Sequence, residues 1–385
     1  MTKSLYWELS KFYYLYYAFV GLFTPYWGLY LTSLKFSPIQ IGLLLAFFQF
    51  GRVVSPNIWG WLADRTNKRS QWVRLIAMMG SIFFVYSFFA NSFYEILFIM
   101  MSMSIFTSST IPLIESLTLA HLSSGKGNFD YSKIRVWGSV GFICAALFMG
   151  FGIDFFGIKA LLFVLLSVQI LIYFQSLRVP EHVSDIKNEA RRPILNVIKD
   201  PQVIAVILGC TLMVSSHGLL YNFYSIYLNT LDYSSMVIGA LWAVGVICEI
   251  LIFLCMPKIL KLVDLKQVLL ISLILAVARF FLIGTFADNL WVLIFAQTLH
   301  AATFGSFHVA SVQIIEYFFH TEHHARGQSL YNSITYGVGG VVGGVVGGAL
   351  IELIGMSETF RLSALLPLLG IIVFYFGLKN FPKKV

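Results

Sequence analysis

Three charged or titratable side chains stand inside long apolar stretches in the second half of the sequence. Glu249 is the single charged residue of the stretch 233–257, and the next two stretches carry Arg279 and His300. Glu249 lies near the middle of its stretch. The other two lie about 10–13 residues from one end, which places all three at a similar depth in helices that rise about 1.5 Å per residue. A carboxylate, a guanidinium and an imidazole at one depth can take up, hold and release a proton.

Such residues are unusual inside a membrane span. The stretch around Glu249 has 25 residues, and about 20 apolar residues are enough to cross a bilayer. A carboxylate near the bilayer centre costs roughly 2.5–3.5 kcal/mol on insertion scales, so it usually faces a cavity and a partner. We therefore predict that Glu249, Arg279 and His300 couple the movement of protons to the passage of a solute.

The composition is that of a polytopic membrane protein. Of the 385 residues, 58% are hydrophobic and 11% are charged, whereas soluble domains carry about 25% charged residues. The spans must be helices, because lipid offers the polar backbone groups no other partner. We predict an all-α polytopic membrane protein with twelve transmembrane helices in two six-helix, pseudo-symmetric halves, with spans at 10–33, 39–62, 73–91, 94–121, 134–156, 159–177, 201–229, 236–257, 267–286, 290–319, 328–354 and 359–378.

The distribution of positive charge predicts the orientation. Of the 26 Lys and Arg residues, 21 fall at the N-terminus, at the C-terminus or near the loops after even-numbered spans. The opposite loops hold only Lys35, Lys159 and Arg361. Because basic residues remain on the cytoplasmic side, both termini are expected in the cytoplasm. The net charge of +8 thus reflects topology, and no nucleic-acid partner is expected.

The chain also divides into two related halves. The polar segment 179–200 is predicted to be a cytoplasmic linker between an N-terminal half, 1–178, and a C-terminal half, 201–385. Tyr30–Gly42 aligns with Tyr227–Gly239 at an offset of 197, with six identities in thirteen positions. Parallel repeats of this kind bind substrate near the bilayer midplane, between the halves. At the same offset, Arg52 falls opposite Glu249.

The turn between the second and third spans carries a recognisable motif. Its sequence, GWLADRTNKR, begins at Gly60 and resembles the cytoplasmic signature GxLaDrxGrk of the major facilitator superfamily, with Asn67 at the second glycine. The resemblance implies that Asp64, Arg65 and Arg69 form a cytoplasmic gate that latches the halves. The alternative is a basic inner loop that only fixes topology.

Spans 4 and 5 are similar to those of the lactose-permease branch of this superfamily. Span 4 contains IPLIE, which ends at Glu115, and span 5 opens with KIRVWGSVGF, which contains Arg135 and ends at Phe142. The resemblance implies that Glu115 and Arg135 form a substrate-contacting pair. Phe142 stands where the family has a tryptophan that stacks on a sugar ring. The alternative for the pair is a structural ion pair near the cytoplasmic face.

The second half continues the match. The resemblance assigns substrate binding and proton transfer to the span-8 acid Glu249, the span-9 Arg279 and the span-10 His300. Two positions depart from the family: Thr303 replaces an acid and Gln297 replaces a lysine. With Thr303 neutral, the role of proton carrier falls to Glu249 or His300.

A second resemblance is to the phenylpropionate-permease group, small bacterial members of the superfamily. It rests on Lys133–Phe142, on Gly239–Phe253 and on a span-2 arginine, here Arg52. It implies import of an aromatic carboxylate across the bacterial inner membrane. A guanidinium suits such a substrate because it can bind a carboxylate through two hydrogen bonds. Arg52 is free for this role if Arg279 pairs with Glu249.

Aromatic and titratable side chains of spans 1 and 7 complete the set of substrate-binding candidates. Tyr26 represents the aromatic residues of span 1, and His217 lies in span 7. The alternative is that Tyr26 packs between helices and that His217 is a hydrogen-bonded packing residue. Sugar and nucleoside symport remain open for the substrate, and export remains open for the direction. Span 5 lacks the Gly-Pro pair of the exporter signature, which favours symport.

The sequence offers no enzyme motif and no metal site. The four cysteines lie inside apolar segments without CxxC spacing, and the histidines at 320, 323 and 324 lack the spacing of metal ligands. The glycines of span 11 are followed by no phosphate-binding Lys-Ser/Thr pair. We therefore expect no enzymatic activity, no metal and no cofactor. The expected partners are a small-molecule substrate, protons and the lipid bilayer, with a monomer as the working unit.

Overall fold

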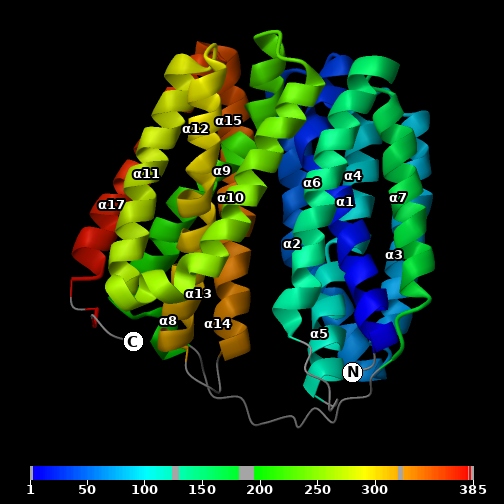
Figure 1. Ribbon diagram of the computed structural model, residues 1–385, viewed down its shortest axis with the longest axis horizontal. Helices are drawn as coiled ribbons and strands as arrows, with labels where there is room; N and C mark the ends of the chain where they lie inside the picture. The colour runs from blue at the N-terminus through cyan, green and yellow to red at the C-terminus, as the bar shows by residue number, and fades with distance from the viewer. Residues whose placement is uncertain (1–2, 124–129, 182–194, 320–323, 380, 383–385) are drawn as a thin grey trace. The chain divides into compact units, whose positions relative to one another are not determined.

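The computed structural model describes residues 3–123, 130–181, 195–319, 324–379 and 381–382, and every regular element among them is helical (Figure 1). The long helices are α1 (Lys3–Ser33), α2 (Pro38–Thr66), α3 (Arg69–Val85), α4 (Phe93–Thr107), α5 (Thr110–Ser123), α6 (Tyr131–Phe156), α7 (Ala160–Ser176), α9 (Pro201–Thr230), α10 (Ser235–Leu262), α11 (Leu265–Phe286), α12 (Leu290–Thr298), α13 (Phe307–Phe318), α15 (Gly339–Ile354) and α17 (Leu365–Gly377). The shorter elements are η1 (Tyr86–Phe88), α8 (Leu195–Ile198), η2 (Ala301–Ser306), α14 (His324–Tyr331), η3 (Asn332–Val338) and α16 (Met356–Ser363).

The predicted all-α membrane fold is confirmed. Ten helical segments among the described residues are long and apolar enough to cross a membrane. Several of them join successive elements, as Leu290–Phe318 joins α12, η2 and α13. The predicted spans 201–229 and 290–319 differ from Pro201–Thr230 and Leu290–Phe318 by one residue at one end. Helix α1 is outside these ten, and α7, with 17 residues, is shorter than the rest, so the count of twelve spans stays a prediction.

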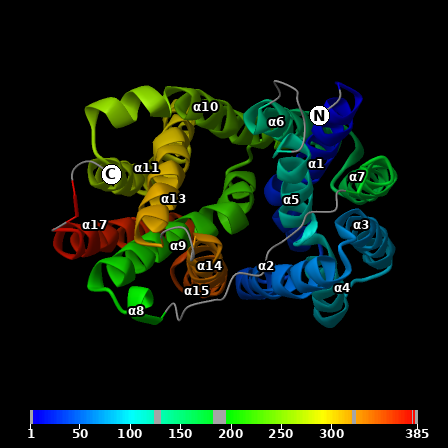
Figure 2. The same cartoon turned by 90° about the horizontal axis from the view of Figure 1, so that it is seen from below.

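The chain forms two compact units. Unit 1 comprises Met1–Phe36, Phe47–Lys187 and Tyr233–Ala243, and unit 2 comprises Ser37–Ala46, Asn188–Asp232 and Val244–Val385. In unit 1, α1 packs against α6 and α7, and α3 packs against α4, α5 and α7. In unit 2, α9 lies beside α15 and α17 (Figure 2). Helix α11 contacts α12, α13, α16 and α17. The predicted division at a 179–200 linker stays a prediction, since residues 182–194 lie outside the described ranges.

The internal repeat is present in the backbone as well as in the sequence. Lys35 follows α1 with φ of 65°, and Asp232, 197 positions later, follows α9 with φ of 60°. Gly157 and Gly355, which follow α6 and α15, have φ of 79° and 83°. A left-handed residue commonly ends a helix, because its N–H bonds back to carbonyls of the last turn. Equivalent helices therefore end in the same way in the two halves of the sequence.

Helix α6 crosses the start of α10 within unit 1. A Cβ added to Gly150 would overlap the carbonyl oxygen of Ser235, so a glycine is needed at this crossing. The Tyr26 hydroxyl donates to the Ala146 carbonyl oxygen at 2.5 Å, and its side chain is fully buried. Tyr26 was a predicted substrate-binding residue. Here it ties α1 to α6, because its buried hydroxyl finds its hydrogen-bond acceptor there.

An equivalent crossing lies within unit 2, between α15 and the start of α2. A Cβ at Gly348 would come within 2.5 Å of the carbonyl oxygen of Pro38. At the end of α15, the Glu352 carboxylate accepts a hydrogen bond from the Ile39 N–H at 3.0 Å. Gly348 follows Gly150 by 198 positions, so the repeat extends to the way these helices pack.

Candidate functional site

A fully buried guanidinium forms the centre of the candidate site in unit 2. Arg279 lies on α11 and has no exposed surface. Its Nη1 donates to His300 Nδ1 and to Thr303 Oγ1, each at 3.0 Å. The same atom lies 3.4 Å from His217 Nε2, and Nη2 donates to Gln297 Oε1 at 3.0 Å. Four neutral acceptors thus surround one cation.

These contacts assign the ring hydrogens of both histidines. A guanidinium is a donor only, so His300 Nδ1 must accept, and the hydrogen of the neutral ring lies on Nε2. His217 Nδ1 lies 3.0 Å from the Met213 carbonyl oxygen and must donate to it, which leaves its Nε2 as the acceptor. Each ring is therefore held with its lone pair toward Arg279.

Glu249 completes the line of contacts. Its Oε2 lies 3.6 Å from His300 Nε2, and its side chain is 18% exposed. Glycines allow close packing of α10 at this depth: a Cβ at Gly305 would lie 2.6 Å from Ile252 Cγ2, and one at Gly245 would lie 3.2 Å from Gln297 Oε1. His300 thus connects Glu249 to Arg279, with one ring nitrogen toward each.

The backbone is distorted at this point. His300 immediately precedes η2, a π-helical turn over Ala301–Ser306. Such turns are rare and occur often at functional sites. The Phe304 ring lies parallel to the His300 ring, with centroids 5.2 Å apart. The sequence predicted no such turn, since periodicity does not distinguish it from an ordinary helical turn.

Two hydrogen-bond acceptors of Arg279 were given no role in the sequence analysis. Gln297 and Thr303 were noted only as departures from a family pattern, yet both accept from the guanidinium. They stand three residues before and three residues after His300, a spacing that places side chains on one helix face. That spacing was the available signal.

The structure alters the predicted pairing of Arg279 with Glu249. Among the described residues, no carboxylate oxygen lies within 4.0 Å of the guanidinium. Glu249 reaches Arg279 through His300, and the imidazole and three other neutral groups contact the Nη1 and Nη2 groups of the guanidinium. A buried charge held only by neutral acceptors is costly, which makes the arrangement a functional candidate.

The candidates of unit 1 gather around α1. The Arg135 guanidinium lies over the Tyr17 ring, 3.9 Å from its centroid. Glu115 accepts from the Tyr131 hydroxyl at 2.7 Å. The alternative, a structural Glu115–Arg135 ion pair, is absent from the described contacts, since each side chain contacts a tyrosine. The role of Glu115 and Arg135 as a substrate-contacting pair stays a prediction. The charges of Arg135, Glu115 and Arg52 all act on the Tyr17 hydroxyl, so these candidates share one neighbourhood.

The remaining unit 1 candidates differ in exposure. Arg52 is exposed and its Nη1 donates to Gln49 Oε1 at 3.1 Å, within α2. Phe142 is 8% exposed, and its backbone packs on α1, where a Cβ at Gly21 would lie 2.9 Å from Phe142 Cα. Arg52 is therefore accessible from solvent, whereas Phe142 is mostly covered.

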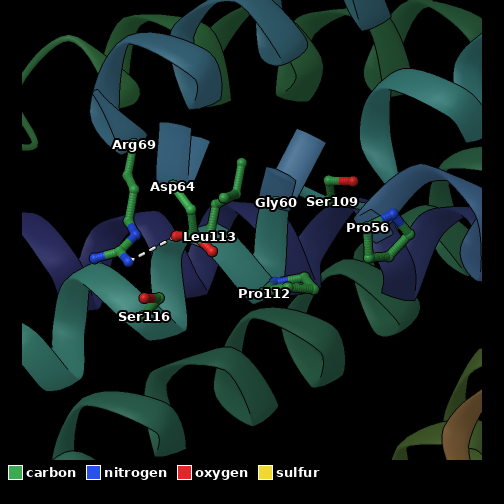
Figure 3. A pocket seen from close by; sticks show the side chains of 8 residues that line it. All are labelled: Pro56, Gly60, Asp64, Arg69, Ser109, Pro112, Leu113 and Ser116. Atoms are coloured by element: carbon green, nitrogen blue, oxygen red, sulfur yellow. Dashed lines mark hydrogen bonds and ion pairs between the residues drawn. The ribbon is translucent and has the colours of Figure 1, made fainter. Parts of the chain in front are cut away.

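The signature turn between α2 and α3 is held by an ion pair. Arg69 Nη2 lies 2.9 Å from Asp64 Oδ1 (Figure 3). Arg65 lies over the Trp61 ring, 5.2 Å from its centroid. Asn67 has φ of 53°, a left-handed conformation that asparagine tolerates better than most residues. This conformation explains how asparagine can occupy the second glycine position of the motif.

A small pocket adjoins this turn in unit 1. Its volume is about 150 Å³. Figure 3 shows Asp64 and Arg69 at one end, with Gly60 and Pro56 farther along α2. Pro112 and Leu113 of α5 also line the pocket, so α2, α3 and α5 all contribute to it.

Metal binding finds no support in the geometry. In the part of the chain that the structure describes, no three His, Cys, Asp or Glu side chains are placed to hold an ion. The histidines at 320 and 323 lie outside that part, as does the side chain of the histidine at 324. The four cysteines are free thiols.

Comparison with known proteins identifies the family. A model of the MFS_1-like family matches residues 6–362. The chain is 26% identical over 317 residues to the "Probable 3-phenylpropionic acid transporter" of Escherichia coli K12, which covers 80% of this chain and 81% of that protein. It is 29% identical over 140 residues to a maltose permease of Geobacillus stearothermophilus, covering 36% of this chain and 35% of that protein.

The fold comparison agrees. The crystal structure of the nucleoside transporter NupG superposes with a TM-score of 0.86 at 19% identity, covering 98% of this chain and 99% of that one. These relatives and structural neighbours are transporters and not enzymes. With nearly the whole chain matched, the protein belongs to the MFS_1-like family and is a transporter of the major facilitator superfamily.

Proposed function

We propose that this transporter is a proton-coupled symporter that imports a small organic solute, with an aromatic carboxylate such as 3-phenylpropionate as the best candidate. The observation that carries the proposal is the line of contacts from Glu249 through His300 to Arg279. It joins a partly exposed carboxylate to a buried cation through an imidazole of fixed orientation. The proton gradient supplies the energy, and no cofactor takes part.

Glu249 is the proton carrier in this mechanism. It is the only carboxylate in the line, and its side chain is 18% exposed, whereas His300 and Arg279 are buried. His300 presents its Nδ1 lone pair to Arg279, so a second ring proton would face the guanidinium. Protonation of Glu249 removes the negative charge at the far end of the imidazole. The positive charge of Arg279 is then less balanced and attracts an anion more strongly.

The order of events follows from this electrostatic coupling. The proton binds first, the anionic solute second, and the loaded protein changes its access from one membrane side to the other. Release of the solute inside restores the ionised Glu249. The working unit is a monomer in the bacterial inner membrane, with both termini in the cytoplasm.

The aromatic carboxylate is preferred for two reasons. The 3-phenylpropionic acid transporter is similar over 80% of this chain, and guanidinium groups at Arg52 and Arg279 suit a carboxylate. The alternative substrate is a sugar. The similarity to maltose permease over 36% of the chain supports this alternative.

The test is proton movement in proteoliposomes. We expect external alkalinisation on addition of 3-phenylpropionate, after correction for passive entry of the acid, and none with a galactoside or uridine. Glu249→Gln should abolish accumulation against a gradient and keep downhill exchange. Uphill transport at the wild-type rate in this variant would remove Glu249 as the carrier. Alkalinisation with the galactoside or uridine instead would assign the substrate to a sugar or a nucleoside.

A further inference from the structure

Two buried donors of the Arg279 cluster have no partner. Arg279 Nε and Gln297 Nε2 are covered from solvent, and neither donates to any described residue. Both side chains are more than nine-tenths buried. Buried donors are nearly always hydrogen-bonded, and an unpaired one costs about 1–3 kcal/mol. Arg279 and Gln297 are hydrogen-bonded to each other, and each still has one buried N–H donor without an acceptor. A third group is needed to accept from these two donors.

The orientation of Gln297 is fixed by its partner. Its Oε1 accepts from Arg279 Nη2 at 3.0 Å. A flipped amide would place two donors against each other, so the free Nε2–H group must point away from Nη2. The Gln297 amide and the Arg279 guanidinium are thus joined by one hydrogen bond, and each keeps a free N–H group.

The charge of this unit is also unbalanced. The acceptors of Arg279 are His217, His300, Thr303 and Gln297, all of them neutral. Thr303 holds the position from which a carboxylate could neutralise the guanidinium, and it supplies a hydroxyl at 3.0 Å. Thr303 thus satisfies one hydrogen bond of Arg279 without cancelling its charge.

We infer that Arg279 and Gln297 receive the carboxylate of the transported solute through these two free donors, and that Thr303 is a positioning residue that keeps the guanidinium uncompensated for it. This inference rests on the proposed function and names the anion-binding residues of the same site. An anionic oxygen satisfies both donors and the charge. A neutral solute of the same shape leaves the charge unpaired, so the site discriminates by charge.

The experiment compares 3-phenylpropionate with 3-phenylpropionamide, which has nearly the same shape and no charge. Binding of each is measured by competition on the purified full-length protein. Thr303→Asp places a carboxylate beside Arg279, and Thr303→Asn is its neutral match. Gln297→Glu also places a carboxylate beside Arg279, and its neutral control is the wild-type glutamine. The amide affinity in each variant reports whether the site remains folded.

We expect Thr303→Asp and Gln297→Glu to reduce the acid-to-amide affinity ratio about 10- to 100-fold, the range of one charge-assisted hydrogen bond. Thr303→Asn should affect both ligands alike and keep the wild-type ratio. A ratio unchanged in both acidic variants would overturn the inference.

The experiments distinguish failure of the proposed function from failure of the anion site. Binding of the acid with the expected ratios, but without proton uptake in proteoliposomes, would leave the anion site standing and remove the coupling. Proton-coupled uptake with unchanged ratios would keep the function and remove the site. A wild-type protein that binds neither ligand would overturn both.

Discussion

The carboxylate of Asp154, at the end of α6, accepts a hydrogen bond at 2.8 Å from the N–H of Ser235, the first residue of α10. The next N–H, of Met236, donates to the same carboxylate at 2.9 Å. Glu352 at the end of α15 does the same for the start of α2. The first N–H groups of a helix lack partners and carry partial positive charge, so a carboxylate there stabilises the contact.

Asp154→Asn should therefore weaken the α6–α10 contact. Loss of the charge removes about 0.3–1 kcal/mol at an exposed helix N-terminus. The expected result is a lower midpoint of thermal unfolding in detergent. Asp288→Asn serves as the control, because Asp288 is exposed and precedes α12 without capping it. Equal midpoints for the two variants would contradict the role given to Asp154.

Gly150→Ala should destabilise the same crossing. The added methyl group overlaps the Ser235 carbonyl oxygen, and forced overpacking of this kind costs about 1–3 kcal/mol. Gly152→Ala is the matched control on α6, since a Cβ there meets its nearest neighbour at 3.8 Å. The measurement is thermal unfolding of both variants. A Gly150 variant as stable as the Gly152 variant would show that the helices can separate without loss.

His300 variants separate its two contacts. In His300→Asn, the amide oxygen can replace Nδ1 as the acceptor from Arg279, but nothing reaches Glu249. We expect this variant to bind 3-phenylpropionate and to lose proton-driven accumulation, measured as uptake with and without a pH gradient. In His300→Gln, the side-chain amide lies near the former Nε2 position and no longer replaces Nδ1 as the acceptor from Arg279. This variant should therefore disturb binding more. Accumulation at the wild-type level in His300→Asn would remove the imidazole from the coupling path.

Asn67 tests the signature turn. At φ of 53°, alanine is strained by roughly 1–2 kcal/mol, whereas glycine is not. Asn67→Ala should lower stability and Asn67→Gly should not, as judged by thermal unfolding.

The ion pair of Asp64 and Arg69 beside the turn is tested by transport measurements. Asp64→Asn should slow transport without shifting the pH dependence that the proposed mechanism assigns to Glu249. A shift would connect the turn to proton binding.

The sequence by itself determined the helical architecture and the chemistry available to it. The lengths of the apolar runs predicted the spans closely, because a helix must cover a fixed hydrocarbon thickness. The rarity of charge inside those runs singled out Glu249, Arg279 and His300. The repeat at an offset of 197 predicted equivalent halves, and Lys35 and Asp232, 197 positions apart, share a positive φ.

Only the tertiary structure decided how these groups meet. The nitrogen of His300 that faces Arg279 is known only from the folded contact. The π-helical turn that follows His300 has one extra residue, which leaves no trace in hydrophobic periodicity. Thr303 and Gln297 are ordinary polar residues until α11 places a guanidinium between them. Tyr26 had the chemistry of a ligand contact, but close helix packing buried its hydroxyl against a carbonyl. Side-chain identity limits which bonds are possible, and the packing of distant segments selects among them.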